Sequence, residues 1–124
     1  MTARTPPPPL RDLDDLRDRL RAFAAARDWD QFHSPKNLAM ALIAEAAELV
    51  EHFQWLTEKQ SSALPPETMA AVADELADVL LYLVRIADKL GVDLLAAAGA
   101  KMDRNETKYP ARRVKGSARK YTEY

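Results

Sequence analysis

Residues 66–91, PETMAAVADELADVLLYLVRIADKLG, carry a long helical pattern of apolar residues. The apolar positions recur at steps of three and four, which is the spacing of one face of an α-helix. We expect this helix to run to about Leu90 and to end at Gly91. Further apolar residues lie outside the main stripe, so the helix must be buried on several sides. The stripe is Val72, Leu76, Leu80, Leu83, Ala87 and Leu90, and the residues outside it are Leu81, Val84 and Ile86.

The polar side of this helix contains a pair of acids, and the preceding helical segment contains another pair. Glu75 and Asp78 are three residues apart, so both carboxylates project from one face about one turn apart. The segment IAEAAELVEHFQW, residues 43–55, repeats the feature with Glu45 and Glu48. Unpaired carboxylates on packed faces repel one another and lose solvation, so four converging acids favour a hard cation such as Mg²⁺.

The rest of the chain also follows helical patterns, and no stretch alternates as a strand does. Ser34 followed by Pro35 is typical of an N-cap and a first helical residue. We therefore predict an all-α fold, a helical bundle of four main helices. The helical period is interrupted at 28–37, where Pro35 begins the next helix, and at 60–66. The predicted helices cover residues 10 to about 27, 35 to about 59, 67 to about 90, and 92 to about 108.

Composition indicates one ordinary globular domain and excludes several classes of function. The 124 residues are 48% hydrophobic and 30% charged, and they include no cysteine, which excludes disulfides, thiolate catalysis and cysteine metal sites. We predict a disordered Pro-rich leader at 1–9, one domain at 10–110 and a basic tail at 111–124. The basic residues of that tail are Arg112, Arg113, Lys115, Arg119 and Lys120.

Charge and hydropathy give no support to a nucleic-acid or membrane partner. The net charge is only -1, and non-specific nucleic-acid binding depends on a cationic surface. The N-terminal residues MTARTPPPPL do not contain the apolar core of a signal peptide, and no apolar run approaches the length of a membrane span. The expected location is therefore cytoplasmic, with no nucleic acid and no membrane among the partners.

Aromatic and cationic residues share the spacing of the acids. Trp55 follows Glu48 by seven residues and Tyr82 follows Glu75 by seven, which returns each ring to the face of its acid. Carboxylates that hold Mg²⁺ recruit phosphate oxygens, and flat rings can stack on a nucleobase. These patterns predict a nucleotide polyphosphate as the ligand. A polar and cationic stripe that could meet its phosphates or sugar consists of Lys101, Asn105 and Lys108.

The chain resembles the MazG-type all-α nucleotide pyrophosphohydrolases, and among them the dCTP pyrophosphatase 1 group, from about Leu16 to Tyr121. Around Glu45 and Glu48 this chain has alanines where such proteins often have glycines, a departure that affects helix packing more than ligation. Five blocks in this order carry the resemblance: RDWDQFHSPKNL (27–38), EAAELVEHFQW (45–55), DELADVLLYLV (74–84), KMDRNETKYP (101–110) and KGSARKYTEY (115–124).

The resemblance implies hydrolysis of a nucleoside triphosphate to the monophosphate and pyrophosphate. The expected substrate is dCTP or a modified dCTP. It implies Mg²⁺, with Mn²⁺ as a substitute, and a homo-oligomer, either a dimer or a tetramer, with sites near subunit contacts. The pyrimidine would stack between Trp29 and Trp55. The implied catalytic metal ligands are Glu45, Glu48, Glu75 and Asp78, and the further nucleotide contacts are Lys101, Asn105 and Tyr109.

Several alternatives stay open on the residues alone. The acids could form solvated helix faces with salt bridges, or bind a structural ion in a non-catalytic assembly module. Both tryptophans could simply pack, as could Tyr82, which is also placed to touch a sugar. Glu51 and Asp74 are either surface charges or groups that support the ligands. A di-iron carboxylate bundle does not fit, because neither histidine follows an acid by three residues within a helix.

Overall fold

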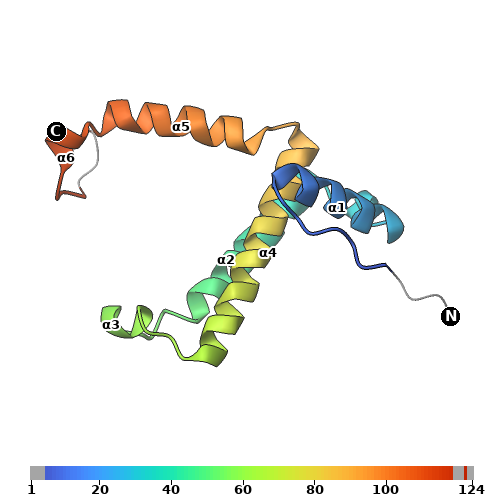
Figure 1. Ribbon diagram of the computed structural model, residues 1–124, viewed down its shortest axis with the longest axis horizontal. Coiled ribbons are helices and arrows are strands. Elements are labelled where there is room, and N and C mark those ends of the chain that lie inside the picture. The colour runs from blue at the N-terminus through green and yellow to red at the C-terminus, as the bar shows by residue number, and fades with distance from the viewer. Residues whose placement is uncertain (1–4, 119–121, 123–124) are drawn as a thin grey trace. The chain divides into compact units, whose positions relative to one another are not determined.

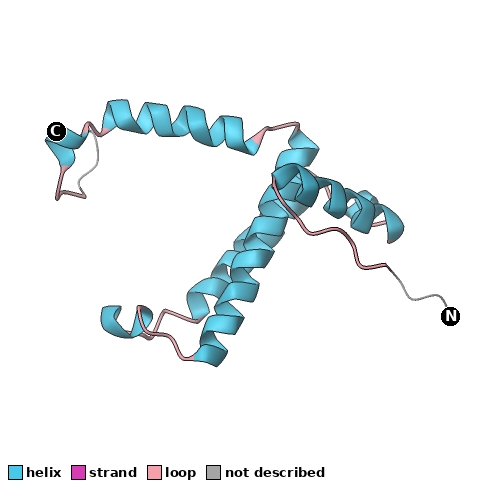
Figure 2. Ribbon diagram, viewed as in Figure 1, coloured by secondary structure: helices cyan, strands magenta, loops and turns pink. Residues whose placement is uncertain are grey.

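A computed structural model of the chain describes residues 5–118 and 122. Regular structure in this part of the chain is entirely helical, which confirms the predicted all-α class (Figure 2). The chain divides into two compact units, Met1–Gly91 and Val92–Tyr124. The elements are α1 (Leu13–Ala26), the 3₁₀-helix η1 (Asp30–Phe32), α2 (Pro35–Glu51), α3 (Glu58–Ser61), α4 (Pro66–Leu90), α5 (Leu94–Lys108) and α6 (Ala111–Val114).

The first unit is built on α2 and α4, which lie side by side and antiparallel (Figure 1). α1 packs against α4 as well. The core between these helices is small, because it is formed mostly by one apolar side of each helix. Its buried apolar residues are Leu16, Ala24, Leu38, Val72, Val84 and Ala87.

The prediction that α4 is buried on several sides is wrong for a single chain. Much of the predicted stripe remains open to solvent, and Leu80 is 41% exposed. A second apolar row lies open on α2. Since two helices cannot cover all sides of a third, an apolar surface remains without a partner within this unit. The exposed apolar residues are Met69, Leu76, Leu80, Leu83 and Leu90 on α4 and Met40, Ile43 and Val50 on α2.

The helix boundaries follow local capping. α2 begins as predicted, with the Ser34 hydroxyl accepting a hydrogen bond from the Asn37 amide at 3.1 Å. The predicted end of this helix at about Lys59 is wrong, because α2 ends at Glu51. Thr57 and Gln60 form a reciprocal capping box that starts the separate helix α3.

The end of α4 is also as predicted. Gly91 adopts a left-handed conformation, with φ of 69°, and its backbone N–H caps the helix. Such a backbone is favourable for glycine because glycine has no Cβ to crowd the following carbonyl oxygen.

The second unit contains α5 and α6. α5 begins at an N-cap, where the Asp93 side chain accepts from the Ala96 amide at 3.0 Å. The predicted basic tail is partly helical, since α6 spans Ala111–Val114. Residues 1–4 of the predicted leader and Arg119 and Lys120 of the tail lie outside the described residues. None of the helices in the described ranges has the length and apolar character of a membrane span.

Candidate functional site

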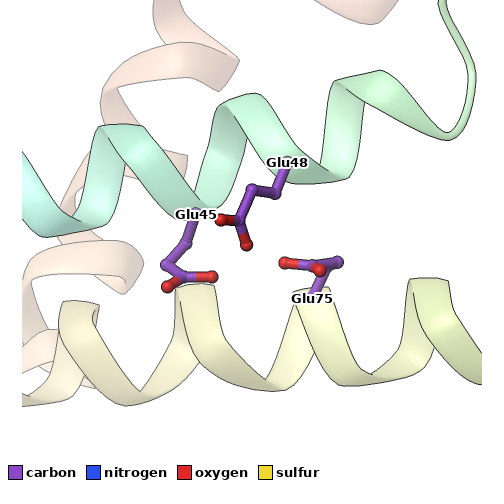
Figure 3. Close-up of side chains that lie close together, drawn as sticks. All are labelled: Glu45, Glu48 and Glu75. Carbon is purple, nitrogen blue, oxygen red and sulfur yellow. The ribbon is translucent and has the colours of Figure 1, made fainter.

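Two helices bring three of the four predicted acids together. Glu45 and Glu48 project from α2, and Glu75 projects toward them from α4 (Figure 3). One carboxylate oxygen of each residue lies within 4.8 Å of the others. The spacing of three residues on α2 and the antiparallel pairing with α4 are together sufficient to produce this convergence.

Burial leaves two oxygens of this cluster without a hydrogen-bond partner. Oε2 of Glu45 and Oε2 of Glu75 are inaccessible to solvent, and neither meets a donor among the described residues. A buried charged oxygen that lacks a donor is costly, because it has lost water and gained nothing in return. The two atoms therefore point to a positively charged ligand that the chain itself does not supply.

The same environment disfavours negative charge on these groups. Burial, a proton shared with Glu48 and the neighbouring carboxylates raise the pKa of Glu45 to about 7. Burial and Glu48 likewise raise the pKa of Glu75. A cluster that holds on to protons near neutral pH is a cluster that gains from exchanging them for a cation.

The donor set fits a hard divalent cation. All three residues offer only carboxylate oxygen, which is the ligand type of Mg²⁺ and Mn²⁺. Asp78 lies one turn beyond Glu75, outside the 4.8 Å group, yet its charge raises the pKa of both Glu45 and Glu75. The neighbouring acids Glu51 and Asp74 are exposed and do not belong to that group.

Trp29 is placed by the way in which α1 ends. The Trp29 amide donates to the Ala24 carbonyl at 2.9 Å, and the Asp28 amide donates to that of Ala25 at 3.2 Å. This is the Schellman arrangement, and Asp28 takes the left-handed position with φ of 54°. The indole then meets Phe23 edge-on, with ring centroids 5.6 Å apart, while 43% of the residue remains exposed.

Trp55 lies at the other end of α2 and is 87% exposed. Trp29 precedes α2 and Trp55 follows it, and a helix of 17 residues is about 25 Å long. A single chain therefore does not bring the two indoles to opposite faces of one base. A sandwich of the predicted kind requires the two rings to come from different copies of the chain.

The remaining predicted contacts fall in different units. Tyr82 is half-buried on α4, on the same stripe as Glu75 and Asp78. Lys101, Asn105 and Tyr109 belong to the second unit, where the Tyr109 amide donates to the Asn105 carbonyl at 2.8 Å. Their contact with a nucleotide stays a prediction.

Comparison with known proteins places the chain in a family. Residues 41–124 match the MazG-like family. The chain belongs to this family. It is 50% identical to dCTP pyrophosphatase 1 of Mus musculus and 48% identical to that of Homo sapiens, each over 113 residues. Each match covers 90% of this MazG-like chain but only 66% of the relative, so the chain spans about two thirds of their length.

A solved structure supports the same assignment. A crystal structure of a pyrophosphatase from Archaeoglobus fulgidus is similar, with a TM-score of 0.76 and 36% sequence identity. The similarity covers 86% of this MazG-like chain and 99% of that chain. The family resemblance inferred from the five sequence blocks is thereby confirmed.

A second polar cluster in this MazG-like fold escaped the sequence analysis. Arg85, which is 5% exposed, reaches Asp30 and His33 of the segment before α2, and Asp88 also pairs with Arg21 of α1. In the sequence Arg85 stands between two apolar residues, Val84 and Ile86, which signals a buried partner for its charge. The sequence did not show which acid, because Asp30 is 55 residues away along the chain.

Proposed function

We propose that this MazG-like protein is a divalent-cation-dependent nucleoside triphosphate pyrophosphohydrolase. Its substrate is dCTP or a modified dCTP, and its products are the monophosphate and pyrophosphate. The observation that carries the proposal is the pair of buried carboxylate oxygens, on Glu45 and Glu75, that have no donor. The names of the 50% and 48% identical relatives, dCTP pyrophosphatase 1, support the choice of reaction and substrate.

In this proposal Glu45, Glu48, Glu75 and Asp78 hold Mg²⁺, for which Mn²⁺ can substitute. When bound, the cation neutralises charge on the triphosphate and orients its oxygens for attack by water. The carboxylates contribute by releasing their shared protons in exchange for the cation. Without a cation they would repel a triphosphate, so nucleotide binding is expected to require the metal.

The nucleotide lies along α4 in the same proposal. Glu75, Asp78 and Tyr82 occupy one stripe of this helix at steps of three and four, and Arg85 continues it toward the segment that carries Trp29. The phosphates would meet the acids, the sugar Tyr82, and the base Trp29. Lys101, Asn105 and Tyr109 are retained as further contacts on the strength of the family resemblance.

We also propose that the active species is a homo-oligomer, a dimer or a tetramer. The exposed apolar rows on α2 and α4 are long enough to seat helices of a second copy, and burying them would complete the core that α4 lacks. Assembly would also allow Trp55 of one copy to approach the base held by Trp29 of another, which one chain cannot do.

Replacing Leu80 by Lys tests this assembly. The change places a charge in the middle of the exposed row, so we expect the oligomer to dissociate in analytical ultracentrifugation. Replacement of Lys59 by Glu, on the exposed helix α3, changes charge outside the row and should leave the oligomer intact. A wild-type chain that sediments as a monomer would contradict the assembly.

The reaction is tested by incubating the full chain with Mg²⁺ and each common nucleoside triphosphate in turn. Ion-exchange chromatography then distinguishes monophosphate plus pyrophosphate from diphosphate plus phosphate. We expect dCMP and pyrophosphate from dCTP, with loss of turnover in EDTA. Diphosphate as the product would contradict the reaction. Absence of turnover with every nucleotide would instead favour a non-catalytic assembly module.

A further inference from the structure

Arg85 holds the segment before α2 against α4. Its guanidinium donates from Nη2 to Oδ1 of Asp30 and from Nε to Nδ1 of His33 at 3.2 Å. Its Nη1 also lies 3.7 Å from the carboxylate of Asp88. The Arg85 side chain is 6% exposed, so a buried charge is neutralised by groups that come from two different elements. Lys89 adds a second cation on Asp30 at 3.0 Å.

The two residues to which Arg85 donates lie next to Trp29. Asp30 is the next residue in the chain, and the His33 ring lies 6.3 Å from the indole, centroid to centroid. The indole also meets Phe23, whose own ring is covered by the guanidinium of Arg27 at 3.6 Å. The partly exposed indole therefore contacts α1 through Phe23 and is linked to α4 through its neighbours Asp30 and His33.

We propose that Arg85 is a positioning residue that holds Trp29 at a set place relative to the carboxylates of α4. The proposal rests on the proposed function, in which Trp29 is the platform for the base. Arg85 follows Glu75 by ten residues, about 15 Å along the same helix, so one rigid element connects the platform with the acids. The planar guanidinium suits this role because it donates to two different acceptors at once, which lysine cannot do in the same geometry.

The bond to His33 adds a requirement on that ring. Because Nε of Arg85 donates to Nδ1, the imidazole must be neutral and carry its proton on Nε2. The neutral ring is consistent with its surroundings, since burial and the Arg85 charge lower the pKa of His33.

Kinetics of Arg85→Gln test the proposal, with Arg21→Gln as the matched control. Arg21 also ties a neighbouring element to the end of α4, through two bonds to Asp88 at 2.7 and 2.5 Å, and its ion pairs are with Asp88 and Asp18 rather than with Asp30. If Trp29 occupies its place only about a tenth of the time without Arg85, KM for dCTP rises about tenfold. We expect kcat to change less than twofold, Arg85→Lys to recover part of the loss, and Arg21→Gln to leave KM unchanged.

A measurement without nucleotide separates this proposal from the proposed function. Trp29 and Trp55 are the two tryptophans of the chain, so in a Trp55→Phe background all tryptophan emission comes from Trp29. Arg85→Gln should make this emission easier to quench with acrylamide, and Arg21→Gln should not. Unchanged quenching and KM would overturn the positioning role. Unchanged KM in Trp29→Leu would overturn the platform role, even if quenching responds to Arg85.

Arg85→Gln may be replaced by a milder variant if it does not fold. Asp30→Asn keeps the shape of a side chain that is 48% exposed and removes the charge that Arg85 and Lys89 share. We expect KM and acrylamide quenching to rise in Asp30→Asn as well, but by less than in Arg85→Gln. If a folded Asp30→Asn chain matches the wild type in both measurements, Arg85 does not act through this segment.

Discussion

α4 carries two polar clusters, and they differ in how their charges are balanced. The acidic cluster consists of Glu45, Glu48 and Glu75, with Asp78 beside it, and two of its buried oxygens have no donor. The arginine cluster joins three cations to two carboxylates and an imidazole. Its members are Arg21, Arg85 and Lys89, then Asp30 and Asp88, and His33.

This difference indicates which cluster needs a ligand that the chain does not supply. In the arginine cluster the buried guanidinium of Arg85 has acceptors within the chain, so burial is compensated at once. In the acidic cluster burial and like charge add up, and the pKa of Glu45 rises to about 7. A fold retains such an uncompensated cluster most readily where a ligand completes it.

The largest expected effect is loss of turnover on changing Glu75 to Gln. Loss of a group that merely supports a metal ligand can lower activity roughly 100-fold. Removal of a ligand oxygen itself should lower the rate by at least as much. Asp74→Asn is the matched control, since Asp74 is the preceding residue, exposed and outside the cluster. Initial rates of dCMP formation measure the effect. Equal rates in both variants would remove Glu75 from the site.

The two clusters should respond with opposite sign when one member is neutralised. Arg85→Gln should lower the free energy of unfolding by about 2 kcal/mol, because charged hydrogen bonds to Asp30 and His33 are lost. Glu45→Gln should raise the stability of the metal-free protein, because it removes charge from a repelling group. Denaturant unfolding in EDTA measures both. A shared sign would abolish the distinction between the clusters.

Stability of the metal-free protein should also depend on pH. The folded chain keeps the Glu45 proton up to about pH 7, whereas an ordinary glutamate, with a pKa of 4.5, releases it earlier. The folded state thus binds more protons between these values, so stability falls as pH rises from about 4.5 through 7. Melting temperatures in EDTA across this range should fall in the wild type and fall less in Glu45→Gln. Identical pH profiles would show that Glu45 has an ordinary pKa.

The smallest predicted effect concerns the turn that presents Trp29. Asp28 has φ of 54°, so Asp28→Ala should cost about 1 kcal/mol of stability, because alanine lacks the short polar side chain that lets aspartate tolerate a left-handed backbone. It also removes the side-chain acceptor for Gln31. Asp28→Gly loses the same acceptor but has no Cβ. Denaturant unfolding should therefore give it a higher free energy of unfolding than Asp28→Ala. If alanine matches glycine, backbone strain at this turn is not significant.

Local signals allowed much of the fold to be predicted. Ser34 with Pro35 starts α2, and Gly91 ends α4. Three of the four predicted acids converge, whereas Asp78 lies outside the group. The predicted end of α2 is wrong because apolar residues continue past Glu51, whereas the capping signal of Thr57 and Gln60 begins a new helix.

Other features depend on groups that are distant in sequence or on a second chain. The pairing of Arg85 with Asp30 spans 55 residues, and no periodic pattern identifies it. The family resemblance implied both tryptophans beside one base, but residue identity does not show that α2 separates them. The exposure of Leu80 likewise depends on what covers α4, which the helical period alone does not reveal.

Binding of Mn²⁺ to the full chain, stripped of metal with EDTA and exchanged into buffer, tests the central claim most directly. Isothermal titration of wild type, Glu75→Gln and Asp74→Asn at pH 8 and pH 6 follows the cation without any nucleotide. The acidic cluster should give saturable binding that releases protons, is weaker at pH 6, is lost in Glu75→Gln and persists in Asp74→Asn. Absence of binding in the wild type, or equal binding in Glu75→Gln, would contradict the assignment of this cluster as a metal centre.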